Sequence, residues 1–213
     1  ENPELLGKAV IVGADPNGGK GRGVVMACSY EARGLGIRSG MPISLAWKKV
    51  PDAVYLPPNY DLYGSVSESV MEVLREHADI LEHSSIDEAF LDVTSKVHGF
   101  TDAAEYARRV KAAVRDREGL ACTIGVAPNK SVAKIASDMA KPDGLLVVRP
   151  DEVTSFLQPL PVTKISGVGT KTAEILGHAG VATIGQLAAF PGSELKKLLG
   201  KNSVWLWGIA RGI

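Results

Sequence analysis

The sequence has little cysteine and no long hydrophobic run, and both shortages narrow the classes of protein that it can represent. Cys28 and Cys122 are the two cysteines in 213 residues, and they have neither the CxxC spacing of a zinc site nor a nearby histidine partner. The pattern favours two buried, reduced thiols over a disulfide. No apolar stretch approaches the roughly 18 residues of a membrane span, and residues 1–4 lack the basic and apolar regions of a signal peptide. We expect a cytoplasmic protein without membrane contact.

An excess of charge of either sign is also missing, because 24 basic residues balance 24 acidic ones. The balance is uneven along the chain: residues 1–148 carry 17 basic and 20 acidic residues, whereas residues 149–213 carry 7 and 4. These signs suit a carboxylate-bearing catalytic part followed by a segment that contacts an anionic polymer. A random scatter of surface charge explains the difference equally well. The 45% share of hydrophobic residues is typical of a globular protein of one or two domains.

The hydrophobic pattern predicts an α+β protein. Strands are predicted at residues 8–13, 24–29, 121–126 and 145–148, and helices at residues 65–78, 101–118 and 129–141. Ser65-x-x-Glu68 resembles a capping box at the start of its helix. From Ile80 onward the order is hairpin, helix, strand, helix, strand, which is typical of a ferredoxin-like sheet with helices on one face. The glycine-rich residues 18–21 lack the spacing of a Walker motif, so a phosphate loop is rejected.

Two adjacent carboxylates, Asp87 and Glu88, fall between two alternating apolar runs. The alternation predicts a β-hairpin with both acids at its tip. Mg²⁺ prefers one or two carboxylates together with substrate phosphates, so the pair suits a metal site for phosphoryl transfer. A solvated acidic turn is the alternative interpretation.

The segment after residue 151 changes to short helices bounded by proline or glycine. Residues 165–173 show a helix-hairpin-helix pattern, in which Gly167 and Gly169 let the backbone approach a phosphate and Lys171 adds a positive charge at the following helix start. Residues 180–188 continue the pattern with a second capped helix. Such a hairpin binds the DNA backbone without base specificity; a plain packed helix pair is the alternative.

Together these motifs resemble the Y-family DNA polymerases, most nearly their DinB-like lesion-bypass branch. The matching segments are Ser29-Tyr30-Glu31-Ala32-Arg33, Gly36-Ile37-Arg38-Ser39-Gly40-Met41-Pro42, Tyr55-Leu56-Pro57, Ser85-Ile86-Asp87-Glu88-Ala89, Gly125-Val126-Ala127-x-Asn129-Lys130-x-x-Ala133-Lys134-Ile135-Ala136-Ser137, Lys141-Pro142-x-Gly144 and the helix-hairpin-helix. The resemblance implies a ferredoxin-like palm in two parts, residues 1–18 and 61–150. It also implies small fingers at residues 19–60 and an all-α thumb at residues 151–213.

The resemblance also implies roles for individual residues. Asp87 matches the family's ligand shared by two Mg²⁺ ions, and Glu88 matches the neighbouring acid near the primer 3′-hydroxyl. Tyr30, Arg33 and Lys141 match the family's contacts with the nucleotide triphosphate, and phenol, guanidinium and ammonium groups can all bind a polyphosphate.

The sequence departs from the family pattern in its extent and at one position. The family's opening strand, with its first catalytic Asp and the aromatic that excludes ribonucleotides, would lie before Glu1, and the little-finger domain would follow Ile213. We therefore expect a catalytic-core fragment that is itself weak or inactive. Ala27 replaces a Thr of many relatives, which removes one neutral hydrogen bond to the triphosphate, worth on the order of 1 kcal/mol.

The resemblance predicts a template-directed DNA polymerase of the translesion type. Its expected partners are primer-template DNA, deoxynucleoside triphosphates and a sliding clamp bound through the C-terminal part that the sequence lacks. We expect a monomer, associated with the nucleoid if the source is prokaryotic. A non-catalytic DNA-binding accessory relative is the alternative, against which Asp87 and Glu88 argue. A nucleotidyl cyclase with a similar palm is a third possibility, against which the helix-hairpin-helix and the Tyr30/Arg33 segment argue.

Overall fold

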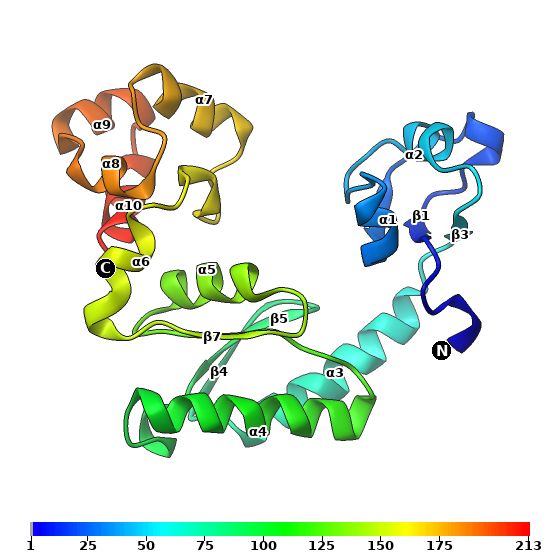
Figure 1. Ribbon diagram of the computed structural model, residues 1–213, viewed down its shortest axis with the longest axis horizontal. Helices are drawn as coiled ribbons and strands as arrows, with labels where there is room; N and C mark the ends of the chain where they lie inside the picture. The colour runs from blue at the N-terminus through cyan, green and yellow to red at the C-terminus, as the bar shows by residue number, and fades with distance from the viewer. Residues whose placement is uncertain (1) are drawn as a thin grey trace. The chain divides into compact units, whose positions relative to one another are not determined.

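The computed structural model describes residues 2–213, which fall into two compact units (Figure 1). The first unit ends at Gly64 and the second comprises Ser65–Ile213. Each unit is described by itself.

The first unit is a three-stranded sheet covered by two short helices. Its elements are β1 (Val10–Gly13), β2 (Val25–Cys28), α1 (Tyr30–Gly34), α2 (Ile43–Lys49) and β3 (Val54–Leu56), with single turns of 3₁₀ helix at Pro3–Leu5 and Asn17–Gly19. β1 is central, antiparallel to β2 and parallel to β3. Ile11, Val25, Ile37 and Ile43 are fully buried in the core beneath the helices. The first two predicted strands are confirmed with shorter bounds.

The helix α3 (Tyr60–Glu76) begins earlier than predicted. Ser65 lies inside it, so the predicted capping box at Ser65 and Glu68 is wrong. Instead, the side-chain oxygen of Asn59 accepts a hydrogen bond of 3.2 Å from the backbone N–H of Leu62. Asparagine is among the preferred residues at this position because its side chain satisfies an amide that has no partner within the helix.

The second unit opens with a hairpin and continues with alternating helices and strands. Its elements are β4 (Ile80–Ser85), β5 (Glu88–Asp92), a 3₁₀ turn at Thr94–Lys96, α4 (Phe100–Glu118), β6 (Ile124–Val126), α5 (Lys130–Ala140) and β7 (Leu145–Val147). β4 and β5 pair antiparallel, whereas β6 and β7 pair in parallel across α5. In Figure 1, α5 runs above β7 and α4 runs below it. The predicted order of elements and the α+β class are confirmed.

Short helices form the rest of the second unit. They are α6 (Val153–Leu157), α7 (Thr170–His178), α8 (Ile184–Ala189), α9 (Gly192–Leu199) and α10 (Asn202–Ala210), with 3₁₀ turns at Pro150–Glu152 and Val162–Lys164. Thr183 and Gln186 form a reciprocal capping box at the start of α8. The predicted second capped helix is therefore confirmed.

One hydrophobic core joins α5 to these C-terminal helices. Val132 and Ile135 of α5 belong to the same buried cluster as Leu176, Leu187 and Leu206. Asn129 adds a polar link: its Oδ1 accepts a hydrogen bond from the N–H of Val132, and its Nδ2 donates one of 2.7 Å to the carbonyl of Gly212. α5 is thus held by its apolar face in the core and by the two hydrogen bonds of Asn129 at its start.

Cys28 and Cys122 are both free thiols. Each is only partly buried, whereas two buried thiols were predicted; this burial raises the pKa of the Cys122 thiol. No helix among residues 2–213 is both long and apolar enough to cross a membrane.

Candidate functional site

The predicted acids lie at the turn of the β4–β5 hairpin. Ile86 and Asp87 form the turn itself, whereas Glu88 is the first residue of β5 and pairs with Ser85, so only Asp87 occupies the tip. The Ser85 hydroxyl donates a hydrogen bond of 2.7 Å to Asp87 Oδ1. The Ser67 hydroxyl, on α3, donates to the carbonyl of Ile86 and fixes the turn to that helix. The Asp87 carboxylate is therefore held at a defined, exposed place.

Glu88 is connected to Lys141 by a chain of ion pairs along α5. Lys134 Nζ lies 2.5 Å from Glu88 Oε1 and 3.3 Å from Asp138 Oδ1, and Lys141 Nζ lies 2.8 Å from the same Asp138 oxygen. We name Glu88, Lys134, Asp138 and Lys141 the α5 ion-pair chain. It brings together two of the predicted site residues through two others that the sequence argument did not single out.

The pKa values of Lys134 and Asp138 reflect their ion pairs. Burial of Lys134 acts to lower its pKa, but the hydrogen bond to Glu88 and the charges of Asp138 and Glu88 outweigh it and raise the pKa above its usual value. Burial likewise acts to raise the pKa of Asp138, and the hydrogen bond from Lys141 with the charges of Lys134 and Lys141 brings it below its usual value. Both groups are thus stabilised in their charged forms.

The loop after Lys141 is fixed by Lys111 of α4. Lys111 Nζ donates to Asp143 Oδ1 at 2.7 Å, to the carbonyls of Asp143 and Gly144 at 2.8 and 3.2 Å, and to the carbonyl of Cys122. Arg115 adds a second ion pair to Asp143 at 2.7 Å. These contacts hold the backbone of Asp143 and Gly144, which follow Lys141 in the sequence.

Tyr30 and Arg33 lie together on α1, in the first unit. Ser29 caps this helix with its hydroxyl oxygen, and the same hydroxyl donates to the carbonyl of Lys8 on the way into β1. The Arg33 guanidinium lies 5.7 Å from the centre of the Tyr30 ring, and its Nε makes a long hydrogen bond of 3.4 Å to the carbonyl of Cys28. Tyr30 is exposed. One face of α1 therefore presents a phenol and a guanidinium to solvent.

The predicted helix-hairpin-helix adopts the geometry that its glycines allow. Gly167 has a φ of +88°, a conformation that residues with a side chain rarely adopt, and an added Cβ would lie 3.1 Å from the ring of Trp205. The extended Gly169 precedes α7 and supplies no side-chain cap. Val168 between them is buried and holds the hairpin in the core. The first amides of a helix have no partners within it, so the start of α7 next to Lys171 presents free donors to an anion.

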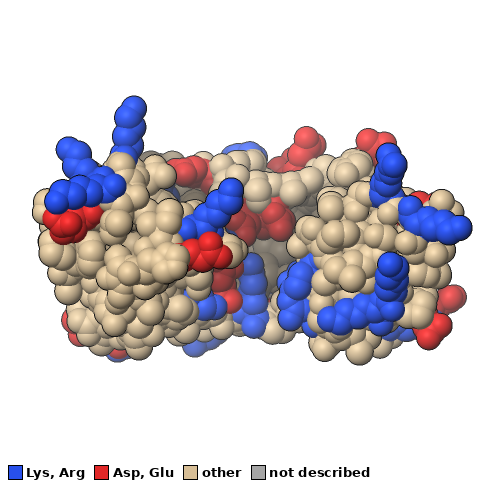
Figure 2. Space-filling model, turned by 90° about the horizontal axis from the view of Figure 1, so that it is seen from above, with Lys and Arg blue, Asp and Glu red and all other residues tan. Residues whose placement is uncertain are grey.

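Basic side chains project from the surface of the C-terminal helices. Figure 2 shows several lysine and arginine side chains on the left-hand part, which carries these helices, with acidic side chains beside some of them. Lys171 makes no ion pair with any residue that the structure describes. Its charge is available to a phosphate.

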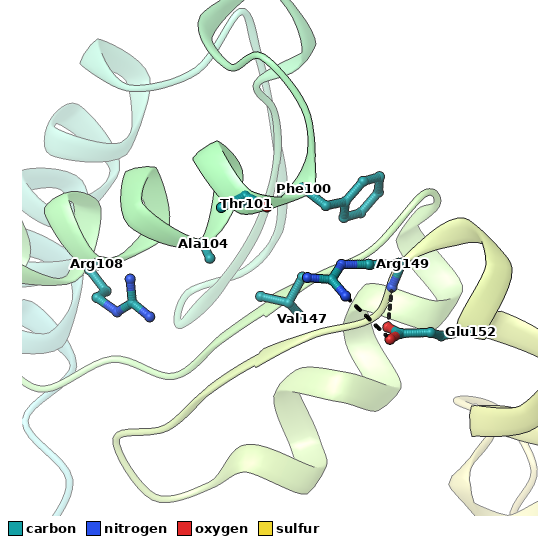
Figure 3. Close-up of a pocket in the computed structure, with 7 residues that line it drawn as sticks. All are labelled: Phe100, Thr101, Ala104, Arg108, Val147, Arg149 and Glu152. Carbon is teal, nitrogen blue, oxygen red and sulfur yellow. Dashed lines mark hydrogen bonds and ion pairs between the residues drawn. The ribbon is translucent and has the colours of Figure 1, made fainter.

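The second unit also contains an open cavity of about 330 Å³ at the beginning of α4 (Figure 3). Its lining residues are Phe100, Thr101, Ala104, Arg108, Val147, Arg149 and Glu152. The carboxylate of Glu152 accepts a hydrogen bond of 3.0 Å from the backbone N–H of Arg149 and lies 3.7 Å from its guanidinium. None of the predicted site residues lines this cavity.

The comparisons with known proteins agree with this arrangement. The model of the impB/mucB/samB family matches residues 1–138, and that of the DNA polymerase eta/Rev1 helix-hairpin-helix motif matches residues 160–213. The chain belongs to the impB/mucB/samB family. The resemblance to DinB-like Y-family polymerases is thereby confirmed.

Similar proteins cover the whole chain. It is 53% identical to DNA polymerase IV of Methanoculleus marisnigri over 212 residues, and 41% identical to DNA polymerase IV of Pseudomonas aeruginosa over 213 residues. It covers 59% and 60% of these proteins, so it spans about three fifths of the length of its curated relatives. Among solved structures, DinB from Sulfolobus solfataricus matches with a TM-score of 0.91 at 39% identity. The match covers 99% of this chain and 62% of the DinB chain. An insertion ternary complex of Dbh DNA polymerase matches with the same score and identity.

The site contains donors of the right kind for a divalent cation, although in small number. Asp87 and Glu88 offer hard carboxylate oxygens at a fixed turn, which suits Mg²⁺. Within residues 2–213 there is no group of three His, Cys, Asp or Glu side chains that could hold a metal ion. A divalent cation here would therefore need further ligands, such as substrate phosphates.

Lys134 and Asp138 were not predicted as site residues. A signal for them exists in the spacing Lys134-x₃-Asp138-x₂-Lys141, because residues three and four apart lie on the same face of a helix. The spacing does not reveal that this face meets the strand that carries Glu88.

Proposed function

We propose that the whole protein is a template-directed DNA polymerase of the lesion-bypass type, which adds deoxynucleotides to the 3′-end of a primer. The observation that carries the proposal is the acidic hairpin: one carboxylate at a turn fixed by α3, and a second connected through the α5 ion-pair chain to Lys141. Such a site needs an anionic substrate that also brings ligands for a cation, and a nucleoside triphosphate does both. The relatives named DNA polymerase IV support the same assignment.

Each proposed role follows from the chemistry of the side chain. Asp87 and Glu88 would hold two Mg²⁺ ions, which when bound stabilise the attacking 3′-oxygen and the leaving pyrophosphate. Lys141 of the second unit, with Tyr30 and Arg33 of the first, would contact the triphosphate, since an ammonium, a phenol and a guanidinium can all donate to phosphate oxygens.

The helix-hairpin-helix supplies the proposed contact with primer-template DNA. Gly167 and Gly169 leave the backbone accessible, the start of α7 directs its amides outward, and Lys171 adds a charge. These groups recognise phosphates and carry no information about base sequence. We accordingly assign residues 19–60 to the fingers, residues 1–18 and 61–150 to the palm, and residues 151–213 to the thumb.

The test is single-nucleotide addition by the full-length protein on four primer-templates that differ only in the templating base. The proposal predicts that the added nucleotide follows the template in each case. Binding of every primer-template without any addition would favour a non-catalytic DNA-binding accessory protein. Addition that ignores the template would contradict the proposal in a different way, because the chain would then transfer nucleotides without copying.

A further inference from the structure

Two members of the α5 ion-pair chain each contact two partners, an arrangement that the proposed roles do not explain. Lys134 contacts two carboxylates, Glu88 on β5 and Asp138 on its own helix, while Asp138 contacts two ammonium groups, Lys134 and Lys141. The two carboxylates and two ammonium groups therefore balance. The Lys134 side chain is 22% exposed, whereas the other three are 36 to 46% exposed. Lys134 is thus the least hydrated member and depends most on its partners.

The distances show how Lys134 divides its interactions in this state. Its ammonium is 2.5 Å from Glu88 and 3.3 Å from Asp138, so the stronger contact is with Glu88. Asp138 meanwhile directs the same Oδ1 atom to Lys141 at 2.8 Å. The contact between Asp138 and Lys134 is weaker while Lys141 occupies that oxygen.

Displacement of Lys141 would change this division. A polyphosphate that binds the Lys141 ammonium takes it from Asp138, because a charged phosphate oxygen is a strong competitor for a cation. Asp138 then has an unpaired carboxylate within reach of Lys134, and Lys134 can shift its ammonium toward Asp138. The Glu88 carboxylate would lose part of its partner and become a better ligand for a divalent cation.

We propose that Lys134 is a positioning residue that pairs with Glu88 while Lys141 is bound to Asp138, and that releases Glu88 to a divalent cation when an anionic polyphosphate draws Lys141 away. The proposal rests on the proposed function in one respect: that function identifies the polyphosphate as a nucleoside triphosphate. It assigns a coupling between cation binding at the hairpin and anion binding at the end of α5, and such a coupling must act equally in both directions.

A double-mutant cycle measures the coupling without a polyphosphate, which would itself bind the cation. The probe is Mn²⁺, whose free concentration is followed by electron paramagnetic resonance in the DNA-free full-length protein. Lys141→Met imitates the departure of the ammonium and should tighten Mn²⁺ binding by about three- to tenfold, the scale of charge interactions at partly exposed sites. Asp138→Asn should weaken binding, because Lys134 is then left to Glu88 alone.

The decisive result is the effect of Lys141→Met in the Asp138→Asn background. If Asp138 connects Lys141 to Lys134, Lys141→Met should change Mn²⁺ affinity by less than about 1.5-fold in the Asp138→Asn background. This result would be a clear departure from additivity. Equal effects of Lys141→Met in both backgrounds would overturn the proposal, since the lysine would then act only through its long-range field. Absence of Mn²⁺ binding by the unsubstituted protein would overturn it as well.

Two further variants separate positioning by Lys134 from a general effect of charge or of folding. Lys134→Arg keeps the cation and should leave the coupling intact, whereas Lys134→Met should abolish it. Lys130→Met is the matched control: Lys130 lies on the same helix and pairs with Glu82 of the same hairpin at 2.8 Å. If Lys130→Met tightens Mn²⁺ binding as much as Lys141→Met does, the proposal fails. Should Lys134→Met not fold, the cycle at positions 138 and 141 still decides, because both side chains are partly exposed.

Failure of this inference can be told apart from failure of the proposed function. Template-directed addition by the unsubstituted protein tests the function alone. Additive effects on Mn²⁺ binding together with normal template-directed addition would reject the coupling and keep the polymerase.

Discussion

Asn129 makes two separate hydrogen bonds whose contributions can be measured one at a time. Its Oδ1 accepts from the N–H of Val132 at 3.0 Å and caps α5, while its Nδ2 donates to the carbonyl of Gly212 at 2.7 Å, near the C-terminal end of the chain. Loss of an N-cap costs about 1 kcal/mol, within a range of roughly 0.5 to 2 kcal/mol. Loss of a neutral hydrogen bond costs about 0.5 to 1.5 kcal/mol.

These values predict a graded series. Asn129→Ser keeps an oxygen that can cap α5 but is too short to reach Gly212, so it should lower the free energy of unfolding of α5 by about 1 kcal/mol. Asn129→Ala removes both interactions and should cost about 2 kcal/mol if the two contributions add. The assay is hydrogen exchange at the amides of α5, which measures local opening and does not require both units to unfold together.

Each outcome of the series has a definite meaning. Equal losses for the serine and alanine variants would show that the cap contributes nothing, and an unchanged serine variant would show that the bond to Gly212 contributes nothing. Either result would refute the conclusion that both hydrogen bonds of Asn129 stabilise α5. Ser131→Ala, one residue into the helix with no cap bond, is the control and should leave α5 within about 0.5 kcal/mol of the unsubstituted chain.

Three other substitutions test separate parts of the account. Lys171→Gln in the full-length protein should weaken DNA binding for all sequences alike and reduce the slope of log affinity against log salt by about 1; an unchanged slope, measured by fluorescence anisotropy, means that the hairpin is structural. Arg33→Ala should raise the apparent KM for all four nucleotides to the same extent in steady-state incorporation, and a base-selective effect argues against a triphosphate contact. The hydrogen bond from Lys111 and the charges of Lys111 and Arg115 hold the pKa of Asp143 below its usual value. This contribution to stability is fully present above the unfolded pKa of about 3.9 and is lost as the pH falls through the lower folded value. Acid unfolding of Asp143→Asn should therefore be less steep below pH 4, and an unaltered profile contradicts the pairing.

The hairpin shows what the sequence was able to predict. Alternation of polar and apolar residues placed the two strands and put acids between them, because a strand exposes every second residue to one face. The prediction that both acids lie at the tip is wrong for Glu88, which is the first residue of β5 and pairs with Ser85. The place of Glu88 depends on a shift in the β4–β5 register between His83, which pairs with Ala89, and Ser85, which pairs with Glu88.

The start of α3 was misplaced because two cap signals compete in this part of the sequence. Ser65 and Glu68 have capping-box spacing, but Asn59 follows two prolines and precedes Asp61, which also marks a helix start. The structure uses Asn59. Residues 60–64 include a glycine and two tyrosines of modest helix propensity, so local preference alone did not favour the longer helix.

The ion pairs along α5 could not be predicted because they depend on tertiary contacts. A helix face with Lys134, Asp138 and Lys141 is compatible with a solvated surface, and its meaning changes only when β5 brings Glu88 against it. The family resemblance, in contrast, predicts Asp87, Glu88 and Lys141 as site residues directly from their motifs.

The most direct test of the account is the rate of a single nucleotide addition by the full-length protein carrying Asp87→Asn. Asp116→Asn is the matched control, because Asp116 is an exposed residue of α4 outside the site. In rapid-quench experiments with saturating primer-template and nucleotide, the account predicts that Asp87→Asn loses about a hundredfold or more in rate, while DNA affinity and the rate of the control stay unchanged. A rate for Asp87→Asn within a few fold of the unsubstituted protein would contradict the assignment of the hairpin acids as the catalytic centre.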